Sequence, residues 1–232
     1  MIEINNASFK YEDKFVLKNI SMKVKEGSFT AIIGANGCGK TTLAKHLNGL
    51  LIPESGEVIV DGYNTRENGL EVRKKVGFVF QNFEDQLVCS IAEEDVAFGL
   101  ENLGIESGEI KKIIIKTLRN LRIEGLAKKN VNVLSFGQKQ LVALAGVLAM
   151  EPKYIVFDEP TTMLDARNKK NIMQVMNDLN KKGKVGIVLV TNVLEDIEYA
   201  DEVVLLKEGR IIFNGEKSKL SRKMFERAGL ND

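Results

Sequence analysis

Hydrophobic and polar residues alternate near the start of the chain. Ile20, Met22 and Val24 are separated by single polar residues, and this period of two is typical of a strand with one buried face. Strands that are buried on one face and solvated on the other are common in antiparallel sheets. The pattern therefore predicts an antiparallel sheet in the N-terminal part of the chain.

Later apolar segments have a different pattern. The runs Tyr154 to Phe157 and Ile187 to Val190 are continuously apolar, as expected for parallel strands covered on both faces. Helical spacing occurs between such runs, with apolar residues at positions 43, 47, 50 and 51 and again at 141, 144, 145, 148 and 149. Strands that alternate with helices predict an α/β fold with a mostly parallel sheet.

The middle of the chain has no strand pattern and is rich in Glu, Lys, Leu and Ile. We interpret residues 83–150 as a helical lobe inserted into a core made of residues 1–82 and 151–232, so that residues 1–232 form a single domain. Near the end of the chain, Val203 to Leu206 and Ile211 to Phe213 flank the turn-forming stretch Lys207-Glu208-Gly209-Arg210. This arrangement predicts a hairpin.

A glycine-rich segment follows the apolar residues 31–33 and precedes the first predicted helix. Gly34-Ala35-Asn36-Gly37-Cys38-Gly39-Lys40-Thr41 matches the pattern G-x-x-x-x-G-K-[ST] in full. In such a loop the backbone N–H groups and the helix N-terminus face phosphates, the lysine reaches the β- and γ-phosphates, and the hydroxyl binds Mg²⁺. We predict that residues 34–41 and Thr42 bind ATP. A plain chain-reversing turn is the alternative.

Two adjacent carboxylates, Asp158 and Glu159, close the apolar run that begins at Tyr154. That strand should end at the same sheet edge as the phosphate loop, where ligands bind in such folds. We predict that Asp158 holds Mg²⁺ and that Glu159 acts as the general base or orients the attacking water. Without the phosphate loop, the pair could simply cap a helix.

Charge and length exclude several classes of protein. The 232 residues include 33 basic and 32 acidic ones, so the net charge of +1 argues against a general nucleic-acid binder. No apolar stretch reaches the roughly 18 residues of a membrane-spanning helix, and the N-terminus has no export-signal pattern. The two cysteines, Cys38 and Cys89, suggest neither a metal site nor a disulfide framework. We expect a cytoplasmic protein.

The segment Leu134-Ser135-Phe136-Gly137-Gln138 resembles the signature of the ATP-binding cassette (ABC) family, usually L-S-G-G-Q. The order of phosphate loop, Gln81, signature, Asp158-Glu159 and Asp165 also follows that family. The resemblance covers essentially the whole chain and implies an ABC-type P-loop ATPase fold. It also implies that two subunits pack head-to-tail, with each ATP held between one subunit's phosphate loop and the other's signature.

The resemblance assigns roles to further residues. Tyr11 matches the aromatic residue that stacks on adenine, although it could be an ordinary strand-end tyrosine. Gln81 matches the glutamine that contacts Mg²⁺ and the attacking water, with a surface glutamine as the alternative. Asp165 matches the aspartate that helps organise the dimer interface. Asn192 stands where the family usually has a catalytic histidine.

Within the family, residues 81–88 and 92–99 look most like the ATPases of energy-coupling-factor importers, which take up vitamins or ions such as cobalt and nickel. The resemblance implies a second, often non-identical ATPase subunit, a multispanning membrane coupling protein and a substrate-binding membrane protein. The chain would then lie peripherally at the cytoplasmic face of the membrane. Simple packing of the lobe could also explain these residues.

Several positions depart from the family pattern. Asn192 cannot exchange a proton near neutral pH, so we expect slower hydrolysis. Phe136 replaces a glycine in the signature and would either crowd the nucleotide or turn away from it, and Leu141 replaces a frequent arginine. The only histidine, His46, is expected on a helix surface. The chain end at Asp232 suggests a reduced C-terminal dimerisation segment.

Two other functions stay open at the level of sequence. Asn192 and Phe136 favour a catalytically weakened regulatory subunit in an asymmetric pair, whereas the intact Lys40, Asp158 and Glu159 favour an active enzyme. A non-transport ABC ATPase acting in translation or on DNA is the third possibility. Such proteins usually carry two cassettes or long coiled coils, which this sequence does not contain.

Overall fold

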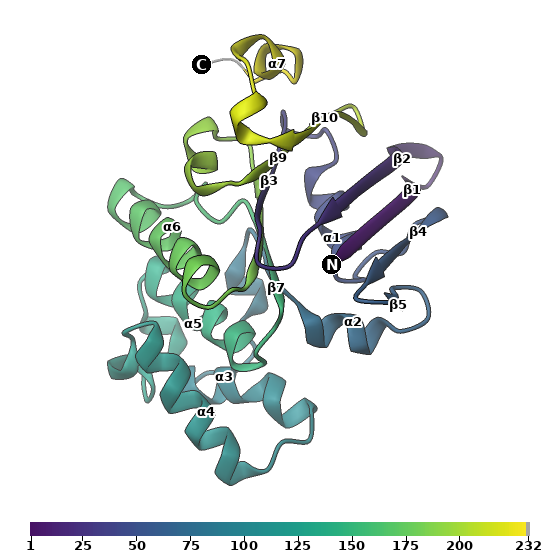
Figure 1. Ribbon diagram of the computed structural model, residues 1–232. Helices are drawn as coiled ribbons and strands as arrows, with labels where there is room; N and C mark the ends of the chain where they lie inside the picture. The colour runs from purple at the N-terminus through teal and green to yellow at the C-terminus, as the bar shows by residue number, and fades with distance from the viewer. Residues whose placement is uncertain (231–232) are drawn as a thin grey trace.

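The computed structural model describes residues 1–230, which form two β-sheets with helices packed around them (Figure 1). The strands are β1 (Ile2–Tyr11), β2 (Lys14–Val24), β3 (Phe29–Ile33), β4 (Ser55–Val60), β5 (Tyr63–Asn64), β6 (Val76–Val79), β7 (Tyr154–Asp158), β8 (Gly186–Thr191), β9 (Glu202–Lys207) and β10 (Arg210–Glu216). The α-helices are α1 (Lys40–Leu47), α2 (Gly69–Lys75), α3 (Ala92–Asn102), α4 (Ser107–Asn120), α5 (Phe136–Ala149), α6 (Ala166–Lys181) and α7 (Arg222–Arg227). The 3₁₀ segments are η1 (Phe83–Gln86), η2 (Glu124–Leu126), η3 (Val131–Val133), η4 (Leu194–Tyr199) and η5 (Lys217–Lys219). The expected reduction of a C-terminal dimerisation segment near Asp232 falls outside the described residues.

The N-terminal sheet has the strand order β2-β1-β4-β5, and each neighbouring pair is antiparallel. The alternating residues of β2 behave as predicted, since Ile20, Met22 and Val24 are buried while the residues between them are exposed. The antiparallel opening sheet predicted from the alternation is therefore confirmed.

The second sheet has the order β10-β9-β3-β8-β7-β6. Strands β9, β3, β8, β7 and β6 run parallel, and only β10 is antiparallel to its neighbour. Alternate residues of this sheet serve two cores: Ile155 and Phe157 pack with the helical part of the chain, whereas Val156 packs with α1 and the antiparallel sheet. Burial on both faces explains the continuously apolar sequences of β7 and β8.

Helices α3, α4 and α5 occupy the middle of the chain, lie together at one end of the molecule in Figure 1 and pack on one another. The fold is thus the predicted α/β type, with a mostly parallel sheet, an antiparallel N-terminal sheet and an inserted helical lobe. The exact limits of the lobe at residues 83 and 150 remain a prediction. No helix within residues 1–230 combines the length and apolarity needed to cross a bilayer.

The predicted hairpin at the end of the chain is β9–β10, and its turn residues Glu208 and Gly209 both have left-handed backbones. Gly209 N–H donates a hydrogen bond to the carbonyl of Cys38 (2.9 Å), and its own carbonyl accepts one from Lys18 N–H (2.8 Å). The hairpin turn therefore fixes the phosphate loop against β2.

Two expectations for the first helix are wrong. Helix α1 ends at Leu47, with Asn48 as its C-cap and Gly49 in the left-handed region (φ 71°), so that Leu50 and Leu51 lie outside it. His46 is buried rather than exposed. Its Nδ1 lies 2.7 Å from the carbonyl of Thr42, its ring packs edge-on against Phe9, and burial lowers its pKa.

Candidate functional site

Four neighbouring parallel strands end at one edge of the sheet, and each is followed by a predicted site segment. Strand β3 leads into the phosphate loop, β8 into Asn192, β7 ends at Asp158, and β6 is followed shortly by Gln81. The register pairs Ile33 with Thr191 and Asp158 with Val190, so these strand ends are level. Strand order and register thus bring together residues that are distant in the sequence.

Two positions of the phosphate loop require glycine, one because of close packing and the other because of its backbone conformation. A Cβ atom on Gly34 would lie 2.2 Å from the carbonyl oxygen of Leu206, and Gly39 has a φ of 107°. Gly39 is also the N-cap of α1, so the loop continues directly into a helix N-terminus. The free N–H groups and dipole of that terminus favour an anion such as phosphate.

Lys40 lies inside this loop and is only 4% exposed. Its ammonium group donates hydrogen bonds to the carbonyls of Gly34 (3.0 Å) and Ala35 (3.2 Å), and lies 3.4 Å from Oε1 of Glu159. The pairing with Glu159 compensates the buried charge. The loop and the acidic pair are thus joined through one lysine.

Thr41 and Asp158 form a second contact between the same segments. The Thr41 hydroxyl donates to Oδ1 of Asp158 at 3.0 Å. Burial raises the pKa of Asp158 to about 6; the Thr41 hydrogen bond opposes this rise, and the neighbouring Glu159 charge adds to it. Lys45 and Lys40 lower the pKa of Asp158 only weakly, and within residues 1–230 the carboxylate forms no ion pair. Two oxygen ligands of this kind, a hydroxyl and a carboxylate, suit a divalent cation.

The oxygen pair fits Mg²⁺ that is bound together with a nucleotide. Mg²⁺ usually takes one or two carboxylates from the protein and completes its shell with phosphate oxygens and water. Among residues 1–230 there is no group of three or more His, Cys, Asp or Glu side chains arranged to hold a metal. The donor set therefore suits a metal–phosphate complex better than a metal enclosed by protein ligands alone.

Glu159 occupies an unusual backbone conformation. Its φ is 48°, in the left-handed region that residues other than glycine seldom adopt, while its N–H still donates to the carbonyl of Val190 (2.9 Å). Oε2 of Glu159 accepts a hydrogen bond from Nε2 of Gln81 at 3.2 Å. The turn therefore directs the carboxylate between Lys40 and Gln81, and strained positions of this kind often occur at functional sites.

Asn192 reaches across the sheet edge to the phosphate loop. Its Nδ2 donates a hydrogen bond to Oδ1 of Asn36 at 2.9 Å. Its Oδ1 is buried and has no hydrogen-bond partner among the described residues. The side chain is thus held over the loop with an acceptor atom left over.

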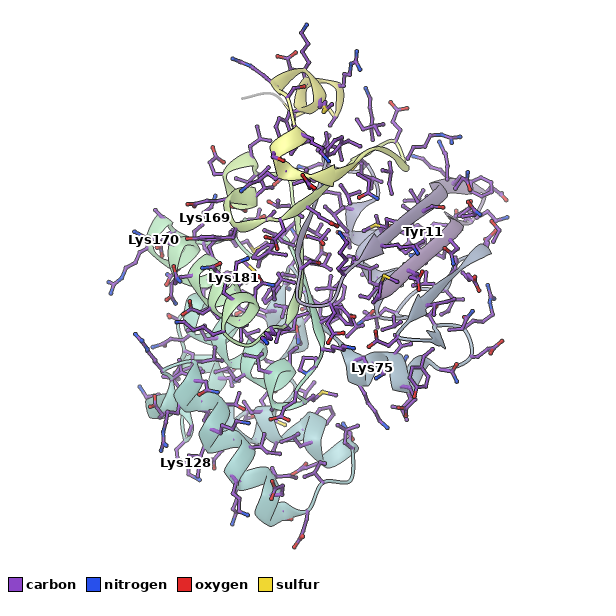
Figure 2. The ribbon with its side chains drawn as sticks, viewed as in Figure 1. Tyr11, Lys75, Lys128, Lys169, Lys170 and Lys181 are labelled. Carbon is purple, nitrogen blue, oxygen red and sulfur yellow. The ribbon has the colours of Figure 1, made fainter. Side chains whose placement is uncertain are left out.

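Tyr11 lies at the end of β1, on the antiparallel sheet, and is 47% exposed (Figure 2). Its ring packs edge-on against Phe9, with 4.9 Å between the ring centroids. An exposed ring supported along one edge can stack on a flat base.

The signature segment forms the start of α5. Ser135 is the N-cap, and its hydroxyl accepts from Gln138 N–H (3.3 Å) while Gln138 Oε1 accepts from Ser135 N–H (3.0 Å). Phe136 packs against Phe83, with 4.3 Å between the ring centroids. Of the two alternatives, this contact favours a ring that turns away from the nucleotide. Within residues 1–230, no hydrogen bond or ion pair joins residues 134–138 to the chain's own phosphate loop.

Asp165 is the N-cap of α6 and accepts hydrogen bonds from the N–H groups of Arg167 (2.9 Å) and Asn168 (3.0 Å). It shares a surface hollow of about 730 Å³ with Ser135 and Gly137. The structure therefore groups the signature with Asp165 on one surface, and groups the phosphate loop with Gln81, Asp158, Glu159 and Asn192 at the sheet edge.

Sequence reasoning missed several contacts. The Asn36–Asn192 pair joins two loops whose contact no local pattern indicates. Gln140 donates to the carbonyl of Pro160 at 2.8 Å from within α5, and a buried polar residue in an apolar helix was a signal that could have revealed it. Asp196 is buried, although the acidic pair Glu195-Asp196 suggests a surface segment.

Comparisons with known proteins agree with this geometry. Residues 17–162 match the family model described as ABC transporter. The chain is 42% identical over 239 residues to an energy-coupling factor transporter ATP-binding protein, EcfA1, of Clostridioides difficile, which covers 100% of this chain and 86% of that protein. It is 44% identical over 216 residues to a cobalt import ATP-binding protein, CbiO, of Syntrophus aciditrophicus, with 91% and 77% covered.

Two solved structures have the same fold. One is cbiO1 from Clostridium perfringens, described as part of the ABC transporter complex cbiONQ, with a TM-score of 0.85, 36% identity and coverage of 97% of this chain and 94% of that one. The other is a dimeric structure of the ATP-binding cassette MJ0796 bound to ADP and Pi, with a TM-score of 0.80, 31% identity and coverage of 93% and 98%.

Proposed function

The chain belongs to the ABC transporter family, and from that premise we propose that it binds and hydrolyses ATP to energise an energy-coupling-factor importer for a vitamin or a transition-metal ion. ATP hydrolysis is supported by the contacts of Lys40 and Gln81 with Glu159, which directly follows Asp158 of the Thr41–Asp158 pair. The names of the relatives, which include a cobalt import protein, support the transport part.

The geometry supports a division of roles among the site residues. The loop N–H groups and Lys40 would bind the phosphates, and Thr41, Asp158 and Gln81 would hold Mg²⁺. A bound Mg²⁺ neutralises charge on the β- and γ-phosphates. Glu159 orients the attacking water and accepts its proton, and the Gln81 amide keeps that carboxylate in place through its hydrogen bond. Tyr11 stacks on adenine.

A second ABC subunit completes the site, packed head-to-tail. The hollow lined by Ser135, Gly137 and Asp165 is the surface that would receive the second subunit's ATP, where Ser135 and the N–H groups of the first turn of α5 would meet the γ-phosphate. Because Phe136 packs on Phe83, the signature itself gives no reason for an unlike partner. The proposal of a non-identical second subunit rests on Asn192, which a homodimer would place in both sites.

An open groove supports contact with a membrane partner. It measures about 470 Å³, lies between α2, α3 and α5, and its lining includes the exposed residues Leu70, Val88 and Phe98. Exposed apolar surface of this kind is common at interaction sites. We assign the multispanning coupling protein to this groove, with the substrate-binding membrane protein carried by it. The chain then lies peripherally at the cytoplasmic face of the membrane.

Uptake by the assembled complex tests this function. The chain would be co-expressed with its membrane partners, and uptake of labelled cobalt, nickel or vitamin would be measured in intact cells. We expect Lys40→Ala to abolish uptake. Phe98→Asp should release the chain from detergent-solubilised partners, whereas Ile115→Asp, which changes an exposed apolar residue on α4, should not. Uptake that continues with Lys40→Ala would contradict the proposal.

Asn192 also favours a second candidate, in which the chain is a catalytically weakened regulatory subunit of an asymmetric pair. Steady-state ATPase assays with and without the co-expressed second subunit separate the two functions. A regulatory chain would leave turnover unchanged when its own Glu159 is replaced by Gln, whereas an active subunit would lose most of it.

A further inference from the structure

Asp196, in η4, is a buried carboxylate that has no role in binding phosphate or Mg²⁺ in the function proposed above. It is 1% exposed. Oδ2 accepts hydrogen bonds from the hydroxyls of Thr161 and Thr191, the latter at 3.1 Å. Oδ1 forms an ion pair with the ammonium group of Lys169 at 2.8 Å, and it accepts no hydrogen bond among the described residues. A buried carboxylate with this many partners has a fixed position and orientation.

Two of the partners belong to the segments that carry the catalytic side chains. Thr161 is two residues after Glu159, in the turn that follows β7. Thr191 is the last residue of β8 and directly precedes Asn192; its hydroxyl also accepts a hydrogen bond from Val193 N–H at 3.0 Å. Asp196 therefore fixes the residues beside both Glu159 and Asn192.

The third partner comes from the surface that carries Asp165. Lys169 lies in the first turn of α6, and its N–H donates to the carbonyl of Asp165, the N-cap of that helix, at 2.8 Å. The Lys169 side chain is 31% exposed and reaches inward to Asp196. Figure 2 shows Lys169 on the same helix as Lys170 and Lys181. One carboxylate thus connects the surface near the signature with the hydrolytic site.

We propose that Asp196 is a positioning residue for ATP hydrolysis, which holds Glu159 and Asn192 in place relative to each other and to the α6 N-terminus. The inference rests on the proposed ATPase function. A buried charge is costly unless it is paired. An apolar side chain could fill the same space without that cost. Charged hydrogen bonds fix direction as well as distance, which apolar packing does not.

The turn from Glu159 to Thr161 is also held on another side, because Gln140 of α5 donates to the carbonyl of Pro160 at 2.8 Å. Helix α5 and η4 therefore both hold a turn that contains the strained Glu159. Small displacements of a catalytic group reduce rate strongly while leaving substrate binding intact. The predicted effect of weakening the Asp196 contacts is a loss of kcat with little change in KM.

Lys169→Met tests the ionic contact, and Lys181→Met is its matched control. Lys181 is on the same helix and also pairs with an aspartate, Asp201, at 3.4 Å, but both side chains are exposed. In the assembled complex we expect Lys169→Met to lower kcat about tenfold or more, with the KM for ATP within about twofold of the parent. Lys181→Met should leave both unchanged, and Lys169→Arg should retain most of the rate.

Thr161→Val and Thr161→Ser test the hydroxyl contact without removing a charge. Valine keeps the volume of threonine but has no donor, and serine keeps the donor. We expect Thr161→Val to lower kcat with unchanged KM and Thr161→Ser to retain activity; circular dichroism melts identify any variant that merely unfolds. Equal rates for Thr161→Val, Lys169→Met and the parent would overturn the role of Asp196. A parent complex without ATPase activity would instead contradict the proposed function, and this inference with it.

Discussion

Among single residues, Lys40 and Asp158 show how unequally the site compensates its buried charges. The ammonium group of Lys40 lies 3.4 Å from the carboxylate of Glu159, whereas Asp158 accepts a hydrogen bond from the neutral hydroxyl of Thr41. Burial accordingly raises the pKa of Asp158 to about 6. The folded chain therefore carries an unfavourable negative charge at neutral pH that a bound divalent cation would stabilise.

Replacing this carboxylate should stabilise the chain. The folded pKa of about 6 lies above the unfolded value of about 3.9, so ionisation destabilises the fold, and this cost grows as pH rises from 4 to 6. We expect Asp158→Asn to raise the free energy of unfolding by about 1–3 kcal/mol at pH 7.5 and to abolish ATPase activity. The gain should vanish near pH 4. Denaturant unfolding of both chains at several pH values measures this difference in the free energy of unfolding. A less stable Asp158→Asn variant at pH 7.5 would show that the ionised carboxylate does not destabilise the fold.

Asn192→His should raise ATP turnover of the assembled complex several-fold. Asparagine has no titratable proton near neutral pH, whereas an imidazole has one, and the position lies beside the phosphate loop, where Asn192 contacts Asn36 at 2.9 Å. Turnover measured between pH 6.5 and 8.5 tests the expectation. A rate equal to or below that of the parent chain would show that Asn192 does not limit hydrolysis.

At this scale, local patterns predict some residues and not others. The phosphate loop and Asp158-Glu159 are recognisable because their chemistry requires particular residue types at fixed spacing. His46 follows no such rule: its burial depends on Phe9, which comes from another element. The Asp196 contacts likewise depend on three segments that meet only in the folded chain.

At the scale of elements, η1 and the signature helix α5 are joined. Phe136 packs on the buried Phe83, and Lys139 forms an ion pair with Glu84. The segment η1 begins two residues after Gln81. The start of the signature helix is therefore held by the segment that follows Gln81.

Phe136→Gly would restore the family's usual signature residue at the expense of this contact. We expect a loss of about 1–3 kcal/mol in the free energy of unfolding, because the ring is removed and glycine disfavours the first helical turn. Phe136→Leu should cost less than about 1.5 kcal/mol, since it keeps an apolar side chain. Urea unfolding of both variants gives the comparison; equal stability of Phe136→Gly and the parent would rule out a structural role for the ring.

The pattern of apolar residues predicts most elements because burial determines it. The alternation in β2 and the continuous runs in β7 and β8 follow directly from one or two covered faces. The end of α1 is a different case. The leucines continue the helical period beyond Leu47, but the left-handed backbone of Gly49 stops the helix.

For the whole molecule, the main feature is the separation of two surfaces. The phosphate loop, Gln81, Asp158, Glu159 and Asn192 lie at the sheet edge, and the signature and Asp165 line a hollow of about 730 Å³. The sequence predicts the first set because its motifs follow the ends of parallel strands, which meet at one edge of the sheet. It predicts the second set through the resemblance to the ABC signature and to the loop that carries Asp165. It cannot predict how Asp196 connects them, since that contact depends on tertiary packing.

ATP turnover of the complex assembled with the second subunit and the membrane partners tests the central claim most directly. We predict that the parent complex hydrolyses ATP and that Lys40→Ala neither binds nor hydrolyses it. Glu159→Gln should bind ATP, arrest hydrolysis and keep the two ATPase subunits associated. Unaltered turnover in Glu159→Gln would contradict the assignment of this chain as the hydrolytic subunit.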